Sequence, residues 1–207
     1  MPTPQLNDPD VKKLLLKMGL AQKPQLVIAR TEAGAVIFEC VDNVNRQVFL
    51  SGGDIKLGWQ IWKTDNSIEA EFHAVWENPQ RQLIDITPKQ FPVGQIMFVP
   101  DSSLTLYGRQ IPNYMINLSN NPLVDDLILV AEAKFAFLNR GERADLKELK
   151  LTVEQDNYHT FMIQVISMIN YILINKGDRE SICPCGKGLK FKHCHGKDLA
   201  EVLASVQ

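Results

Sequence analysis

The stretch that most restricts the fold is a predicted β-hairpin in the first half of the chain, IEAEFHAVWENPQRQLIDITP at residues 68–88. Both arms alternate between apolar and polar residues, as strands with two different faces do. The Asn-Pro-Gln segment between the arms predicts the turn. A turn centred on Pro79 places His73 directly opposite Asp85, with their Cβ atoms about 5 Å apart. This register is inferred, and a slip of one residue would separate the pair.

A carboxylate that faces an imidazole is the orienting half of a nucleophilic triad, which also requires a nucleophile. Cys40 is the candidate, because the apolar residues that follow it recur at helical spacing: Val41, Val44, Val48 and Phe49. Gly52 ends that segment. The pattern therefore places Cys40 near a helix N-terminus, which stabilises a thiolate, as does a neighbouring imidazole.

Bulk properties exclude several classes of protein. The 207 residues fit one medium domain plus an appendage, and 45% of them are hydrophobic, enough for a sizeable core. The net charge of -2 gives no global attraction to nucleic acid or membrane. The N-terminus lacks the pattern of a signal peptide, and the most apolar stretch, residues 161–174, is too short and too polar to span a bilayer. A cytoplasmic protein with four reduced cysteines is expected.

The remaining segments suggest an α+β fold. Residues 9–20 have helical spacing, with Asp8 as the expected N-cap. Residues 57–62 and 97–100 resemble strands that would lie beside the hairpin. Two longer helical patterns follow at residues 121–140 and 146–176.

The most specific motif lies near the C-terminus, where residues 182–196 read ICPCGKGLKFKHCHG. The spacing C-x-C-x8-C-H supplies three thiolates and an imidazole, the ligand set of a closed tetrahedral zinc site: Cys183, Cys185, Cys194 and His195. Gly186 and Gly188 permit the sharp turns that a C-x-C knuckle needs. A segment this poor in apolar side chains needs the metal to fold. His193 is an alternative ligand.

This tail resembles the SEC-C motif, the zinc-binding tail of the bacterial preprotein-translocation ATPase, which also occurs on many unrelated bacterial proteins. The resemblance covers about fifteen residues and implies a docking module that uses zinc as its cofactor. Four lysines with no acidic residue among them would favour an acidic protein or surface: Lys187, Lys190, Lys192 and Lys197. The net charge and the scarcity of interleaved aromatic residues argue against a nucleic-acid partner.

The segment HAVWENPQRQLIDITP at residues 73–88 resembles the transglutaminase-like branch of the papain-like cysteine hydrolases. Domains of that family carry His-Ala at the base position, a hairpin turn, and then an Asp followed closely by Thr. Their Cys lies a few tens of residues upstream at a helix N-terminus. The resemblance implies that Cys40 is the nucleophile, His73 the general base and then acid, and Asp85 the residue that orients His73.

Simpler interpretations of the same residues stay open. Cys40 is also consistent with a small apolar residue buried in the core, and a histidine on a strand is often structural. The acidic residues on the His73 face would make a different site, a His/carboxylate metal centre formed by Glu69, Glu71, His73 and Asp85. The three tryptophans fit either a substrate groove or core packing: Trp59, Trp62 and Trp76.

The sequence thus predicts a transglutaminase-like α+β domain at residues 1–145, in which a small antiparallel sheet packs on helices. A connecting helix at 146–177 and a SEC-C zinc module at 178–207 follow. The expected function is an amide or thioester hydrolase or acyltransferase that acts on a peptide or protein. The alternative is a non-enzymatic adaptor that binds a partner through the zinc module, with an inactive Cys-His-Asp site.

Overall fold

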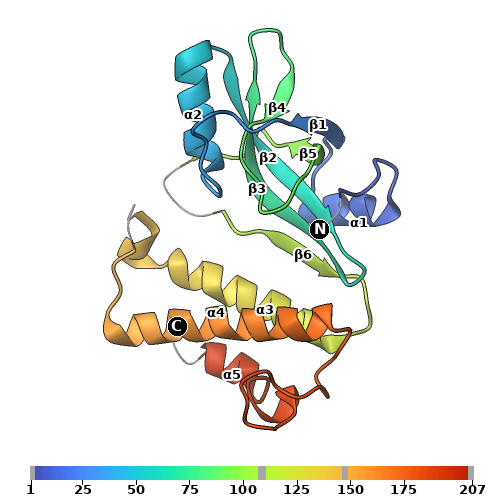
Figure 1. Cartoon of the computed structure of the whole chain (residues 1–207), viewed down its shortest axis with the longest axis vertical. Helices are drawn as coiled ribbons and strands as arrows, with labels where there is room; N and C mark the ends of the chain where they lie inside the picture. The colour runs from blue at the N-terminus through green and yellow to red at the C-terminus, as the bar shows by residue number, and fades with distance from the viewer. Residues whose placement is uncertain (1–2, 107–110, 146–148, 205–207) are drawn as a thin grey trace. The chain divides into compact units, whose positions relative to one another are not determined.

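The computed structural model describes residues 3–106, 111–145 and 149–204. It divides the chain into two compact units (Figure 1). The first unit holds Met1–Thr105 and Asn113–Ile116, and the second holds Leu106–Pro112 and Asn117–Gln207. The mixed α+β class predicted from the sequence is confirmed.

The division differs from the expected one at residue 145, because helix α3 (Pro122–Leu138) belongs to the second unit. It packs against helix α4 (Val153–Ile174), so α4 is half of a helix pair rather than a plain connector. Of the helix predicted from residue 146, residues 146–148 lie outside the described ranges, and α4 begins at Val153 after a reciprocal capping box between Thr152 and Gln155.

The sheet of the first unit is closed. Its strands are β1 (Gln25–Ala29), β2 (Asp54–Lys63), β3 (Ser67–Glu77), β4 (Leu83–Asp85), β5 (Gln95–Pro100) and β6 (Tyr114–Asn117). They are ordered β2-β5-β1-β4-β3-β6, and the additional pairing of β2 with β3 closes the barrel (Figure 1). The predicted small antiparallel sheet therefore needs correction, since it closes on itself and β1 runs parallel to β4.

The hairpin forms, but its register differs by two residues from the predicted one. Trp76 pairs with Ile84, so Asp85 lies two residues from the position opposite His73. The cause is a longer turn, in which the Asn78 side chain accepts the backbone N–H groups of two later residues and Arg81 has a φ of 64°. A shift of two residues leaves each side chain on its predicted face.

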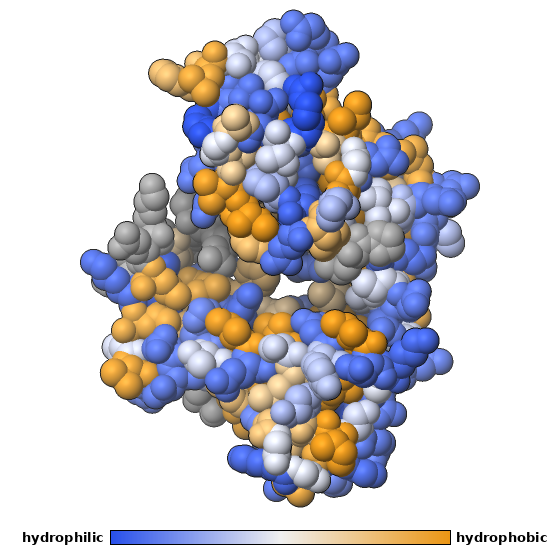
Figure 2. All heavy atoms as spheres, in the orientation of Figure 1, coloured by the Kyte–Doolittle hydropathy of each residue, from blue (hydrophilic) through white to orange (hydrophobic). Residues whose placement is uncertain are grey.

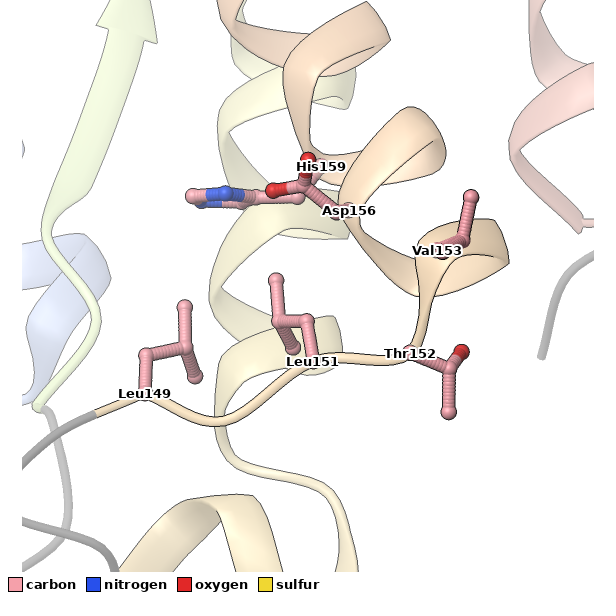
Figure 3. A pocket seen from close by; sticks show the side chains of 6 residues that line it. All are labelled: Leu149, Leu151, Thr152, Val153, Asp156 and His159. Atoms are coloured by element: carbon pink, nitrogen blue, oxygen red, sulfur yellow. The ribbon is translucent and has the colours of Figure 1, made fainter.

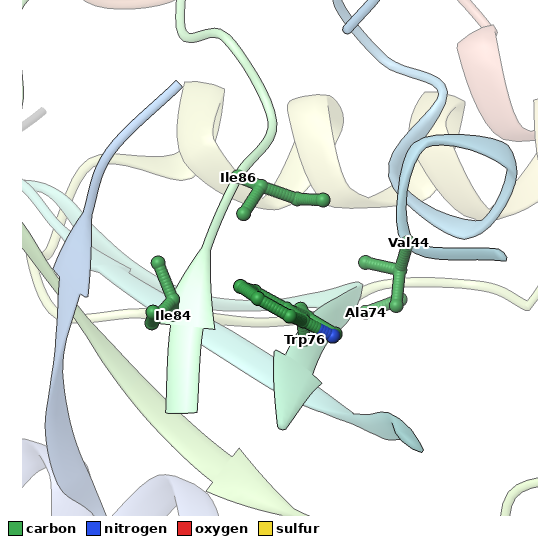
Figure 4. Packing of buried hydrophobic residues seen from close by; sticks show 5 residues of the cluster. All are labelled: Val44, Ala74, Trp76, Ile84 and Ile86. Atoms are coloured by element: carbon green, nitrogen blue, oxygen red, sulfur yellow. The ribbon is translucent and has the colours of Figure 1, made fainter. Parts of the chain in front are cut away.

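Two apolar clusters lie on opposite faces of this sheet. The inner cluster contains Val27, Val75, Ile96 and Phe98. Helix α2 (Cys40–Ser51) covers the outer face, and the outer cluster contains Val44, Ala74, Trp76, Ile84 and Ile86 (Figure 4). The three tryptophans are buried, which favours core packing over a substrate groove. Helix α1 (Pro9–Met18) begins after Asp8, whose side chain caps it as predicted.

The second unit adds short elements to the α3–α4 pair. They are η1 (Gly141–Asp145), η2 (Phe191–His193) and α5 (Leu199–Ala204). The Asn121 side chain caps α3 and donates to the Gly177 carbonyl, and Tyr158 Oη donates to the Leu203 carbonyl. These bonds hold the C-terminal segment against the helix pair.

Within the described ranges, no helix combines the length and the apolar character that crossing a membrane requires. Apolar and polar side chains are interspersed on the face that Figure 2 shows.

We expect Gly58→Ala to destabilise the first unit by about 1–3 kcal/mol. A Cβ at Gly58 would lie 2.6 Å from Phe98 Cζ and closer still to the Val99 carbonyl, inside a packed sheet. Urea unfolding followed by tryptophan fluorescence measures this, because all three tryptophans lie in the first unit.

Gly94→Ala is the matched control, since a Cβ at Gly94 meets nothing within 4 Å. Equal stability of the two variants would show that the barrel does not pack as tightly at Gly58 as described.

Candidate functional site

Cys40 is the first residue of α2, and a folded loop leads to it. Asn43, one turn into the helix, holds both backbone groups of Val36: its Oδ1 accepts from the N–H at 2.8 Å and its Nδ2 donates to the carbonyl at 2.7 Å. Between Val36 and Cys40, Phe38 has a φ of 68°, which is uncommon for a residue other than glycine. Cys40 is partly exposed, at the end of the helix where backbone N–H groups point outward.

His73 and Asp85 form a buried pair. His73 Nε2 lies 3.0 Å from Asp85 Oδ1, and the side chains are 6% and 0% exposed. Burial lowers the pKa of His73, but the hydrogen bond to Asp85 and the interaction with Cys40 outweigh it and raise that pKa to about 9. His73 and Asp85 are thus in direct contact and Cys40 interacts with His73, while the catalytic role of the three residues stays a prediction.

Two residues near Asp85 hold its carboxylate. The backbone N–H of Thr87 donates to Oδ1 at 3.1 Å, and Lys89 Nζ lies 2.8 Å from Oδ2. Burial raises the pKa of Asp85, but His73 and Lys89 outweigh it, and the pKa is lowered. The Thr87 hydroxyl accepts from Asn43 Nδ2 at 3.3 Å, which links the strand end to the Cys40 helix.

Sequence reasoning missed three residues of this network: Asn43, Gln60 and Lys89. Lys89 Nζ donates to Gln60 Oε1 at 2.9 Å and lies 3.2 Å from His73 Nε2. A lysine four residues after a predicted catalytic acid, in a segment with few charges, was the available signal. Nothing in the strand pattern marked Gln60, which is 1% exposed.

The alternative metal site on the hairpin does not form among the residues that the structure describes. Glu71 Oε2 accepts from Trp62 Nε1 at 2.6 Å, and Glu69 Oε1 accepts from Asn113 Nδ2 at 2.8 Å. Both carboxylates are therefore engaged away from His73. The described part of the chain brings together another group that can hold a metal ion.

That group is Cys183, Cys185, Cys194 and His195, whose ligand atoms all lie within 4.8 Å of one another. Cys183 Sγ and Cys194 Sγ lie 3.2 and 3.4 Å from His195 Nδ1, and Cys185 Sγ lies 3.5 Å from Cys194 Sγ. The edges of a tetrahedron around zinc, with bonds of about 2.1–2.3 Å, are about 3.6–3.8 Å long. Small adjustments of the side chains would give that geometry, so the donor set fits the ion. His193 is not in this group.

A short antiparallel ribbon brings the ligands together. Ile182 bridges to Lys190, and the Cys183 N–H donates to the Leu189 carbonyl at 2.8 Å. The turn between them uses Gly186 and Gly188, with φ of 82° and 70°.

The turn also supplies a backbone hydrogen bond to one of the ligands. The Lys187 backbone N–H donates to Cys185 and is the main cause of the lowered pKa of that thiol. Burial raises the pKa of Cys194 to about 11, helped by the neighbouring thiols, and burial lowers the pKa of His195. A bound cation would favour the thiolate form of Cys194.

The metal-ligand segment packs against the helix pair and is not a loose tail. Cys183 is 1% exposed and contacts Met168 of α4 at 3.9 Å. Arg179 Nε pairs with Asp126 of α3 at 3.0 Å, and its Nη2 donates to the Gly196 carbonyl. Phe191 is fully buried beneath Gly196, where a Cβ would lie 2.5 Å from the ring.

The expected lysine patch is partly neutralised. Glu180 pairs with Lys190 at 3.0 Å and with Lys192 at 2.6 Å. Among the residues that the structure describes, no ion pair is found for Lys187 or Lys197.

A hollow of about 390 Å³ lies beside the start of α4 (Figure 3). Its lining is Leu149, Leu151, Thr152, Val153, Asp156 and His159. The His159 ring stacks on Phe137 with centroids 5.9 Å apart, and burial lowers the pKa of His159. The hollow contains no cysteine and does not include the residues of the two clusters described above.

Comparison with protein-family models, curated proteins and solved structures gave no match, so the two resemblances depend on the quoted residues alone.

Asp85→Asn is expected to lower the pH at which the His73 ring titrates, by about two units or more from its value near 9. Burial and the Lys89 charge both disfavour the imidazolium, and the carboxylate that opposes them would be gone. Ring ¹⁵N NMR of the two proteins measures the shift. A His73 that titrates near 6.5 in the unaltered protein would contradict the buried ion pair.

Proposed function

We propose that Cys40, His73 and Asp85 form the catalytic site of a cysteine hydrolase or acyltransferase that acts on an amide or thioester of a peptide or protein. The observation that carries the proposal is the arrangement of His73, which is hydrogen-bonded to Asp85 and interacts with Cys40, the first residue of a helix. This is the arrangement of a nucleophile, a base and an orienting acid. It supports a transglutaminase-like chemistry.

The steps follow from these positions. His73 takes the Cys40 proton, and the thiolate attacks the acyl carbon, with the Cys40 backbone N–H available to the oxyanion. The bond to the leaving group breaks as His73 returns its proton to the departing nitrogen or sulfur. Water or an amine then attacks the thioester, gives a proton to His73, and releases the acyl group while the Cys40 thiol reforms.

We further propose that the four ligands bind zinc and that the segment around them is a SEC-C-type module. Zinc would supply folding energy to a segment whose own apolar core is largely Phe191. The chain's four cysteines are free thiols, as a reducing cytoplasm would keep them.

A second candidate function is that of an adaptor, in which the module binds an acidic protein or surface and the cysteine site is inactive. Lys187 and Lys197 favour it, since they lie beside the metal ligands without a described ion pair. Lys187→Glu with Lys197→Glu would then abolish partner binding, whereas Cys40→Ala would not.

Cys40 is expected to react readily with iodoacetamide at pH 7, because it begins a helix and interacts with His73. His73→Ala and Asp85→Asn should each slow the reaction at pH 7 by roughly tenfold or more, because an ordinary thiol is only a few per cent thiolate there. Mass spectrometry of the protein prepared with zinc identifies the alkylated residue.

His159→Ala is the matched control, an imidazole outside the site that should leave the rate unchanged. A slow reaction at pH 7 that is equal in all variants would mean that Cys40 is structural.

One zinc ion per chain is expected, and Cys183→Ser should abolish stoichiometric binding while Cys40→Ser retains it. Chelation should unfold the segment around the ligands, since the metal supplies its folding energy. Metal analysis and circular dichroism measure the two effects. A chain that keeps its fold and stability after complete removal of metal would contradict the structural role.

A further inference from the structure

Lys89 is the charged group in the cysteine site that the proposed chemistry does not yet use. Its ammonium nitrogen lies 2.8 Å from Asp85 Oδ2, 2.9 Å from Gln60 Oε1 and 3.2 Å from His73 Nε2. Its side chain is only 13% exposed. A lysine is seldom buried unless its charge has a partner, and here Asp85 provides that partner.

Lys89 and Asp85 contact the same ring nitrogen of His73, Nε2. Nε2 lies 3.0 Å from Asp85 Oδ1, and it donates to that oxygen when it carries a proton. An ammonium group has donors only, so Lys89 can hydrogen-bond to Nε2 only when that nitrogen has no proton. Asp85 and Lys89 therefore favour opposite protonation states of the same ring nitrogen.

The charge balance of the buried cluster also shows how Lys89 opposes protonation of His73. Asp85 is 0% exposed, and a buried carboxylate needs a compensating positive charge. If His73 were its sole partner, the imidazole would have to stay protonated to provide that charge. With Lys89 in place, the carboxylate is compensated even while His73 is neutral.

We infer that Lys89 is a positioning residue whose charge opposes the doubly protonated form of His73, so that the ring can pass to a leaving group the proton that it took from Cys40; this rests on the proposed cysteine chemistry. The groups that face His73 are Asp85, Cys40 and Lys89, and the charge of Lys89 lowers the pKa of His73 while the other two raise it. A general acid works best when its pKa lies near the working pH, and Lys89 moves His73 in that direction.

The test is the titration of the His73 ring by ¹⁵N NMR, on the full-length chain prepared with zinc. Lys89→Met should raise the titration midpoint by about one pH unit or more, because Asp85 remains while the neighbouring cation is removed. Lys89→Gln, which keeps a donor but not the charge, should do the same and serves if the Met variant does not fold. Lys89→Arg should stay near the unaltered value.

The control is Lys63→Met, which removes an ammonium paired with Asp8 and Asp10 in the same unit and should leave His73 unchanged. A midpoint that stays constant or falls in the folded neutral variants would overturn the role of Lys89.

Iodoacetamide rates on the same samples separate this inference from the proposed function. Fast alkylation of the unaltered chain with an unshifted histidine in Lys89→Met would overturn the Lys89 inference alone. An unreactive Cys40 would overturn the proposed function, and the NMR shift would still report on Lys89.

Discussion

A buried pair of opposite charges, His73 and Asp85, is the interaction that the rest of the first unit has to accommodate. A carboxylate with no exposed surface is costly unless its charge is compensated and its oxygens have partners. The strand end provides the Thr87 N–H, and the following loop provides Lys89. The same Thr87 bonds to Asn43, so the helix that carries Cys40 is tied to the pair by a polar contact as well as by its apolar face.

Features that are set by residues close together in the sequence could be predicted, and features that depend on distant residues could not. The N-terminus of α2 and the two-sided hairpin follow from periodicity, and both are present. The register was wrong by two residues because the Asn78 side chain builds a longer turn, which no alternation pattern reveals. The closure of the barrel depends on pairing between strands far apart in the chain. Lys89 pairs with Asp85 only four residues before it, so the sequence offered a signal for it, whereas nothing in the β2 strand pattern marked Gln60.

The metal-ligand segment shows the opposite case, because its ligand spacing is a local property. Four donors within 4.8 Å are what the C-x-C and C-H spacing predicts, and the two glycines adopt the left-handed backbone that the turn needs. The surroundings were less predictable. Arg179 and Met168 attach the segment to the helix pair, and Glu180 forms ion pairs with two of the four lysines. The resemblance to a docking tail therefore describes the ligands better than it describes the surface around them.

The pairing of Gln25 with Phe98 also bears on the order of folding. The β2–β3 hairpin and the contact of His73 with Asp85 join segments close in sequence, and they can form early at little cost in loop-closure entropy. β1 precedes both, yet it must wait for β4 and β5 before its backbone groups find partners. During synthesis, the site residues are complete before the barrel that shields them can close. The slow step of folding should therefore be the capture of the first strand rather than the assembly of the site.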